Sequence, residues 1–155
     1  MKINVIDEKY RPIYSTSCAA GADVRARVDG DAIALLPNSK VVIPLGFSLE
    51  EMDRHEANYY RLGLDYVLEA HIRGRSGLWF KHDITVGQMG TIDADYPNEV
   101  CIKLFNHGDK TFYINDGDRV GQIVFARAYR PISGDDGCIL SDFLRSDGFG
   151  STGVK

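Results

Sequence analysis

Residues 66–73 read YVLEAHIR, and this stretch decides the fold class. Apolar and polar side chains alternate along it, and a period of two sends successive side chains to opposite faces of an extended chain. The stretch therefore predicts a β-strand with one buried face. The two faces are Tyr66, Leu68, Ala70 and Ile72 on one side, and Glu69, His71 and Arg73 on the other.

The rest of the chain repeats this pattern between turn residues. EVCIKLF (99–105) alternates in the same way, with Val100, Ile102 and Leu104 on one side. Short apolar runs divided by Gly, Pro, Asn and Asp predict an all-β domain, a barrel or a sandwich, with one small helix. Further predicted strands are 41–49 and 119–129, the predicted turns are NDGD (115–118) and DYPNE (95–99), and the predicted helix is SGLWFKH (76–82).

Composition limits the function classes. The chain has 155 residues, enough for one domain with its own core, and a net charge of −4, which argues against a general nucleic-acid binder. Its three cysteines form no CxxC pair and its four histidines share no metal-ligand spacing, so neither a disulfide framework nor a zinc site is expected. The first residues lack the apolar run of a signal peptide or membrane helix. We therefore expect a protein of the cytoplasm, or of the host cytoplasm or nucleus if it is viral.

The end of the chain carries GFGSTG (148–153), which satisfies the G-x-G-x-x-G spacing of dinucleotide-binding loops. Such a loop must follow a strand and open a helix, and no helix can follow Gly153. Two interpretations stay open on local grounds: a flexible glycine-rich tail, or a segment whose backbone wraps around phosphate oxygens.

Four other stretches suggest chemistry. In GTIDADYPNEV (90–100), Asp93 or Asp95 is either a solvated turn residue or a proton acceptor. In GRSGLWF (74–80), Ser76 is a natural helix N-cap, and Arg75 offers donors that match phosphate. Asp23 lies among small residues in CAAGADVRA (18–26), and Gln122 interrupts the apolar run of GDRVGQIVF (117–125), so it must find a partner or a ligand.

The order of these motifs is more specific than any one of them. AGADVRA, GRSGL, GTIDADYPNEV, GDRVGQIVF and GFGSTG follow one another from residue 20 to residue 153, and together they resemble the five motifs of the trimeric dUTPase family. The resemblance implies a jelly-roll-like β-barrel over residues 1–142 and a C-terminal arm, 143–155, that closes over a neighbouring subunit's site. It also implies a homotrimer that hydrolyses dUTP to dUMP and pyrophosphate with Mg²⁺. This reaction keeps uracil out of DNA and supplies dUMP for thymidylate synthesis.

By the same resemblance, Asp93 is the general base that activates the attacking water. Tyr96 packs against the deoxyribose and excludes a 2′-hydroxyl, while the hairpin backbone between about Gly87 and Asp95 bonds uracil with help from Gln88. Asp23 holds a water bound to Mg²⁺. The residues implied in phosphate binding are Arg75, Ser76, Gly77 and Gln122 from the barrel, and Arg145, Ser151 and Thr152 from the arm, where Phe149 stacks on uracil.

The chain departs from the family pattern at several points. Gly74 stands where Pro is usual, Pro97–Asn98 replaces a Gly-containing turn, and the spacing from Arg145 to Phe149 is one residue short. The 50–65 segment is longer than the usual connection and is a candidate binding site for a protein partner.

Two other functions compete with a dUTPase. One is a dCTP deaminase of the same superfamily, and the other is a regulatory protein switched by nucleotide occupancy. Ammonia release from dCTP would identify the first, and a stoichiometric protein partner would identify the second.

Overall fold

The computed structural model describes residues 2–49, 66–88 and 90–129, and these ranges form three β-sheets in which every pairing is antiparallel. The four-stranded sheet has the order β1 (Ile3–Val5), β5 (Lys40–Leu49), β9 (Glu99–Asn106), β7 (Ile84–Val86). The five-stranded sheet has the order β2 (Ile13–Tyr14), β3 (Ala22–Arg25), β11 (Arg119–Tyr129), β6 (Tyr66–Arg73), β8 (Ile92–Asp93). A ribbon of β10 (Phe112–Ile114) and β4 (Ile33–Leu35), the 3-10 turn η1 (Glu8–Tyr10) and the helix α1 (Ser76–His82) complete the fold.

The core lies between the two large sheets. β9 alternates strictly along its length, and its residues Val100, Ile102 and Leu104 are almost fully buried. The inward side chains of β5 and those of the five-stranded sheet meet them, as expected when two sheets pack face to face. The predicted jelly-roll-like all-β fold is therefore confirmed. Other core residues are Val24, Ile43, Leu45, Phe47, Ala70 and Ile123.

A β-bulge shapes β11 at the start of the strand. The register of β11 against β3 shifts between Arg119 and Gly121, and both Val120 and Gly121 are buried. At Gly121 the sheets come so close that an added Cβ would lie 2.6 Å from Cδ1 of Ile102. The extra residue lets two successive residues face the core, while Arg119 and Gln122 face away from it.

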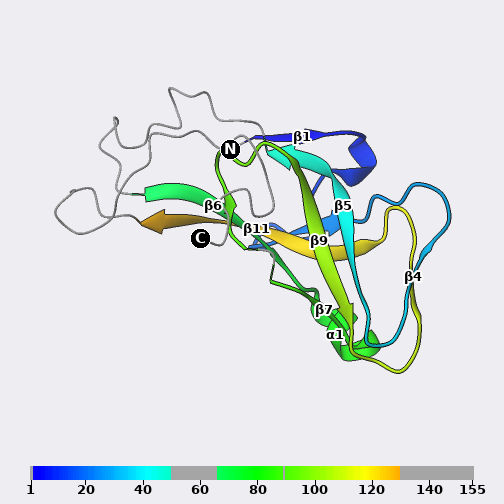
Figure 1. Ribbon diagram of the computed structural model, residues 1–155. Helices are drawn as coiled ribbons and strands as arrows, with labels where there is room; N and C mark the ends of the chain where they lie inside the picture. Colours follow the sequence, from blue (N-terminus) through cyan, green and yellow to red (C-terminus); the bar gives the residue numbers. More distant parts are fainter. Residues whose placement is uncertain (1, 50–65, 89, 130–155) are drawn as a thin grey trace, which may run out of the picture.

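The predicted strands at 66–73 and 119–129 are confirmed as β6 and β11. The weaker helix signal at 76–82 is also confirmed, as α1. Figure 1 shows β6 and β11 side by side as a long ribbon, and eight residue pairs hold them in register. The NDGD turn is also present, since the amide of Asp118 donates to the carbonyl of Asn115 at 3.1 Å.

The predicted turn at 95–99 was wrong in position. The hydrogen-bonded turn spans residues 93–96, where the amide of Tyr96 donates to the carbonyl of Asp93 at 3.1 Å, and Asn98 forms only a bend. β8 pairs with β6 through two residues only, so the strand ends at Asp93 and the chain reverses at once.

Two predictions fall outside the described residues: the C-terminal arm at 143–155 with its boundary at residue 142, and the 50–65 segment. Within the described ranges, no helix is both long and apolar enough to cross a membrane.

Candidate active site

Asp23 is a charged residue buried on the outer side of β3. Its neighbours Ala22 and Val24 face the core, so its own side chain points the opposite way, and only 6% of that side chain is exposed. β3 lies between β2 and β11, which places Asp23 opposite Ile13 on one side and Gln122 on the other. A buried carboxylate in this position requires hydrogen-bond partners.

Four side chains supply those partners. Oδ1 of Asp23 accepts from Nε2 of Gln122 at 3.0 Å and faces Nε of Arg75 at 3.3 Å. Oδ2 accepts from Oγ of Ser15 at 3.2 Å and from Nη1 of Arg119 at 3.2 Å. A carboxylate offers about four acceptor sites, so the group is saturated. We refer to Ser15, Asp23, Arg75, Arg119 and Gln122 as the Asp23 cluster.

The surroundings of Asp23 keep it ionised. Burial alone would raise the pKa of its carboxyl group, but the hydrogen bonds from Gln122 and Ser15 and the charges of Arg75 and Arg119 outweigh burial and lower that pKa. With one carboxylate and two guanidinium groups, the cluster carries a net charge of +1. It is therefore suited to an anionic ligand.

Arg75 joins the cluster to α1. Its guanidinium is held at a second point, because Nη1 donates to the backbone carbonyl of Arg119 at 3.3 Å. Arg75 itself is the N-cap, with φ −92° and ψ 132°, and Ser76 is the first helical residue. The sequence-based expectation that Ser76 caps the helix was therefore wrong, because Arg75 is still extended as it leaves β6. Ser76 and Gly77 are exposed in the first turn, where a Cβ on Gly77 would meet no atom within 4 Å.

Asp93 lies in a contrasting setting. It is the exposed last residue of β8, at the edge of the five-stranded sheet, opposite Glu69 of β6. The turn that follows leads into Tyr96, which is only 7% exposed and belongs to the core. Asp95 lies inside this turn, two residues after Asp93.

One chain does not bring Asp93 to the Asp23 cluster. Asp93 is opposite Glu69, Glu69 is opposite Ala126, and Gln122 lies four residues from Ala126 along β11. With about 3.4 Å per residue along a strand and about 4.8 Å between neighbouring strands, Asp93 and Gln122 are about 17 Å apart within the sheet.

The segment after β7 has one clear backbone contact. The amide of Gly87 donates to the carbonyl of Lys103 on β9 at 2.7 Å, and Gln88 follows as an exposed residue. This ties the start of the predicted uracil-binding hairpin to the four-stranded sheet. The predicted site residues Arg145, Phe149, Ser151 and Thr152 lie outside the described part of the chain.

Sequence reasoning missed Ser15 and Arg119. Arg119 does lie within the quoted motif GDRVGQIVF, but an arginine between a turn and an apolar strand is usually solvated. Only the bulge and the pairing of β11 with β3 show that it reaches Asp23. Ser15 follows β2, a strand of two residues, which is too short to give a periodic signal.

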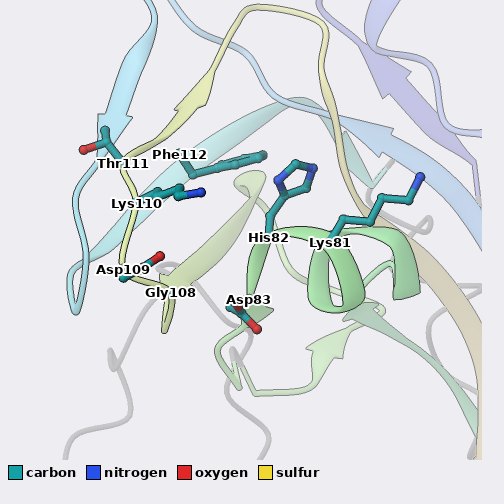
Figure 2. A pocket seen from close by; sticks show the side chains of 8 residues that line it. All are labelled: Lys81, His82, Asp83, Gly108, Asp109, Lys110, Thr111 and Phe112. Carbon is teal, nitrogen blue, oxygen red and sulfur yellow. The ribbon is translucent and has the colours of Figure 1, made fainter.

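A small hollow at the other end of α1 is separate from the cluster. It has a volume of about 180 Å³, and its lining comes from the end of the helix and the 108–112 segment (Figure 2). The rings of His82 and Phe112 are 5.1 Å apart there. None of the predicted site residues lines this hollow.

The donor set restricts how a metal can bind. Among the described residues, no group of three or more His, Cys, Asp or Glu side chains is arranged to hold an ion. The cluster has a single carboxylate, so Mg²⁺ would have to take most of its ligands from bound phosphate and from water. One of the Mg²⁺-bound waters would then donate a hydrogen bond to Asp23, in place of one of the present donors.

Comparison with known proteins points to one family. The dUTPase family model matches residues 7–153. The deoxyuridine 5'-triphosphate nucleotidohydrolase of Rhizobium rhizogenes is 40% identical over 146 residues, covering 92% of this chain and 85% of the relative. The enzyme of the same name from Chlamydia felis is 38% identical over 149 residues, covering 93% and 91%. The crystal structure of dUTPase from Streptococcus mutans superposes with a TM-score of 0.64 at 25% identity, covering 86% of this chain and all of that one.

Proposed function

The chain belongs to the dUTPase family, and we propose on that basis that it hydrolyses dUTP to dUMP and pyrophosphate. The observation that carries the proposal is the Asp23 cluster. Asp23, Arg75 and Gln122 come from three separate motifs, yet they meet within hydrogen-bonding distance around one positively charged site. Such a site suits a triphosphate.

In the proposed reaction, the oxygen of a water molecule bonds to the α-phosphorus. The bond from that phosphorus to the bridging oxygen breaks, and pyrophosphate leaves with the bonding electrons. Asp93 accepts the proton of the water. Its exposed position at the end of β8 suits this role, because a general base must reach the substrate from the surface of its own chain.

The phosphates bind at the Asp23 cluster and the adjacent turn of α1. Arg75 and Gln122 donate to phosphate oxygens, and the exposed backbone of Ser76 and Gly77 allows the chain to approach closely. When bound, Mg²⁺ would neutralise part of the phosphate charge, with Asp23 as the carboxylate that accepts from one of its waters.

Tyr96 and the hairpin select the nucleoside. In this proposal, the small exposed part of Tyr96 lies against C2′, and because the rest of the residue is packed into the core it cannot yield to a ribose hydroxyl, which is rejected by steric clash. The backbone from Gly87 to Asp95, with Gln88, pairs with uracil. On the arm, Phe149 covers the base, while Arg145, Ser151 and Thr152 hold the terminal phosphate.

We further propose that the active unit is a homotrimer of the cytoplasm with sites between its chains. The separation of about 17 Å between Asp93 and Gln122 supports an intersubunit site, since one chain alone cannot apply both to one triphosphate. A neighbouring chain would contribute Asp93, and a C-terminal arm (143–155) would cover the bound substrate.

The direct test is pyrophosphate release from dUTP, dCTP, dTTP and UTP, with and without Mg²⁺. We expect rapid release from dUTP with Mg²⁺ and little from the others. Ammonia release from dCTP without pyrophosphate would contradict the proposal in favour of a deaminase. A chain ending at residue 144 should assemble normally but turn over slowly, and full activity would refute the role of the arm.

A further inference from the structure

We propose that Arg119 is a positioning residue of the triphosphate site, which acts by sharing Asp23 with Arg75. The inference rests on the proposed function, and it assigns a role to a residue outside the set predicted for the site. Arg119 reaches Asp23 through its side chain and Arg75 through its backbone carbonyl.

The charge balance gives the reason. If Asp23 faced Arg75 alone, the two would form a neutral ion pair, and Arg75 would have little charge left for phosphate. Arg119 takes the second carboxylate oxygen at 3.2 Å, so one negative charge is divided between two guanidinium groups. One positive charge remains at the site as a result.

The contacts of Arg75 also fix the orientation of its guanidinium group. Arg75 is fixed through Nε by Asp23 and through Nη1 by the carbonyl of Arg119. Two fixed points on a planar guanidinium determine the direction of its remaining N–H groups. The bulge between Arg119 and Gly121 makes this possible, because it turns Arg119 outward beside Asp23.

The side chain of Arg119 is half exposed, whereas that of Asp23 is almost fully buried. Replacing the arginine should therefore leave the core intact and change the electrostatics of the site. This difference allows a positioning role to be tested apart from a structural one.

The test compares Arg119→Gln, which keeps a hydrogen-bond donor but loses the charge, with Arg119→Lys, which keeps the charge. Affinity for inorganic pyrophosphate and for a non-hydrolysable dUTP analogue is measured by calorimetry at several salt concentrations. For Arg119→Gln we expect about a tenfold loss of affinity for both probes at low salt, because one charge is removed from a partly screened site. Its affinity should also fall less steeply with salt than that of the wild type.

Arg119→Lys should retain most of the wild-type affinity. The matched control is Arg127→Gln, on the same strand with an exposed side chain that lies over the ring of Tyr66, and it should bind both probes normally. Melting curves verify that each variant is folded.

Wild-type affinity and salt dependence in Arg119→Gln would overturn the inference, as would equal damage in the glutamine and lysine variants. These binding measurements do not require turnover. A wild-type chain that binds pyrophosphate but releases none from dUTP would contradict the proposed function and leave the role of Arg119 intact.

Discussion

Asp23 and Asp93 belong to the same five-stranded sheet, but the first is buried and the second is exposed. The cluster joins β3, β11 and Ser15, the residue after β2, and Arg75 at the start of α1 completes it, so its carboxylate is buried and saturated. Asp93 ends a two-residue edge strand and faces solvent. Within a chain, the Asp23 cluster is already held together by hydrogen bonds and ion pairs, while Asp93, the base in our proposal, lies at an exposed sheet edge.

The largest effect on turnover is expected from replacing Asp93, the exposed carboxylate of the two. Asp93→Asn should lower kcat by about a thousandfold, because it removes the general base while keeping the shape of the side chain. Its melting temperature should match the wild type, since Asp93 is exposed at a sheet edge. Steady-state pyrophosphate release and a thermal melt measure both quantities.

Asp95→Asn is the matched control for that variant, because Asp95 lies inside the same turn. It should retain nearly full turnover. The assignment of the base fails if Asp93→Asn turns over at the wild-type rate.

Replacing the buried Asp23 should lower activity and stability together. Asp23→Ala should cost about 2 kcal/mol of unfolding free energy, less than for a fully buried pair because Arg75 and Arg119 are partly exposed. It should also lower kcat/KM by about a hundredfold, because Arg75 and Gln122 lose the group that orients them. Urea unfolding and initial rates give the two values.

Asp29→Ala is a suitable control for the stability change. Asp29 also pairs with an arginine, Arg27, but 84% of its side chain is exposed, so the unfolding free energy should barely change. An Asp23→Ala variant as stable as this control would show that the cluster is not preorganised.

A smaller effect, on the selectivity between dUTP and UTP, is expected from replacing Tyr96, the core residue that follows the turn. Tyr96→Leu should lower the preference for dUTP over UTP by about tenfold, because a smaller side chain leaves room for the 2′-hydroxyl. Tyr96→Phe keeps the ring and should keep the preference. The ratio of kcat/KM for the two nucleotides decides this, and equal selectivity in all three proteins would exclude the ring as the discriminator.

The smallest effect concerns pH. The pKa of Asp23 is lowered in the folded state, so the stabilisation that it provides is fully present above its unfolded value near 3.8 and is lost as the pH falls through the lower folded value. The difference in unfolding free energy between wild type and Asp23→Asn should therefore be constant above about pH 5 and shrink at lower pH.

Asp116 should not disturb this difference. Hydrogen bonds from Lys9, Tyr10 and Val28 lower its pKa in the same direction, but its titration is common to both proteins and cancels. A difference that stays constant down to pH 2.5 would contradict the ionic character of the cluster.

Sequence periodicity predicted the long elements because each carries several periods. β6, β9 and β11 have eight or more residues, whereas β2 and β8 have two each and give no detectable alternation. The order of the motifs predicted Asp23, Arg75, Gln122 and Asp93 as site residues. Pattern alone could not show that the first three meet and the fourth does not, because that depends on strand register.

Arg119 illustrates the same limit. Its residue type suits a solvated turn, and nothing in the local pattern reveals that the strand after it contains a bulge. The strand pairing of β11 with β3, together with that bulge, places its guanidinium beside Asp23.

Subunit mixing tests the intersubunit site most directly. Asp93→Asn and Asp23→Ala chains, each nearly inactive alone, are unfolded together in equal amounts and refolded as mixed trimers. If each site takes Asp93 from one chain and the Asp23 cluster from another, about a quarter of the sites regain both groups, and about a quarter of wild-type activity should return. No recovery in verified mixed trimers would place both groups in one chain's site and contradict the account.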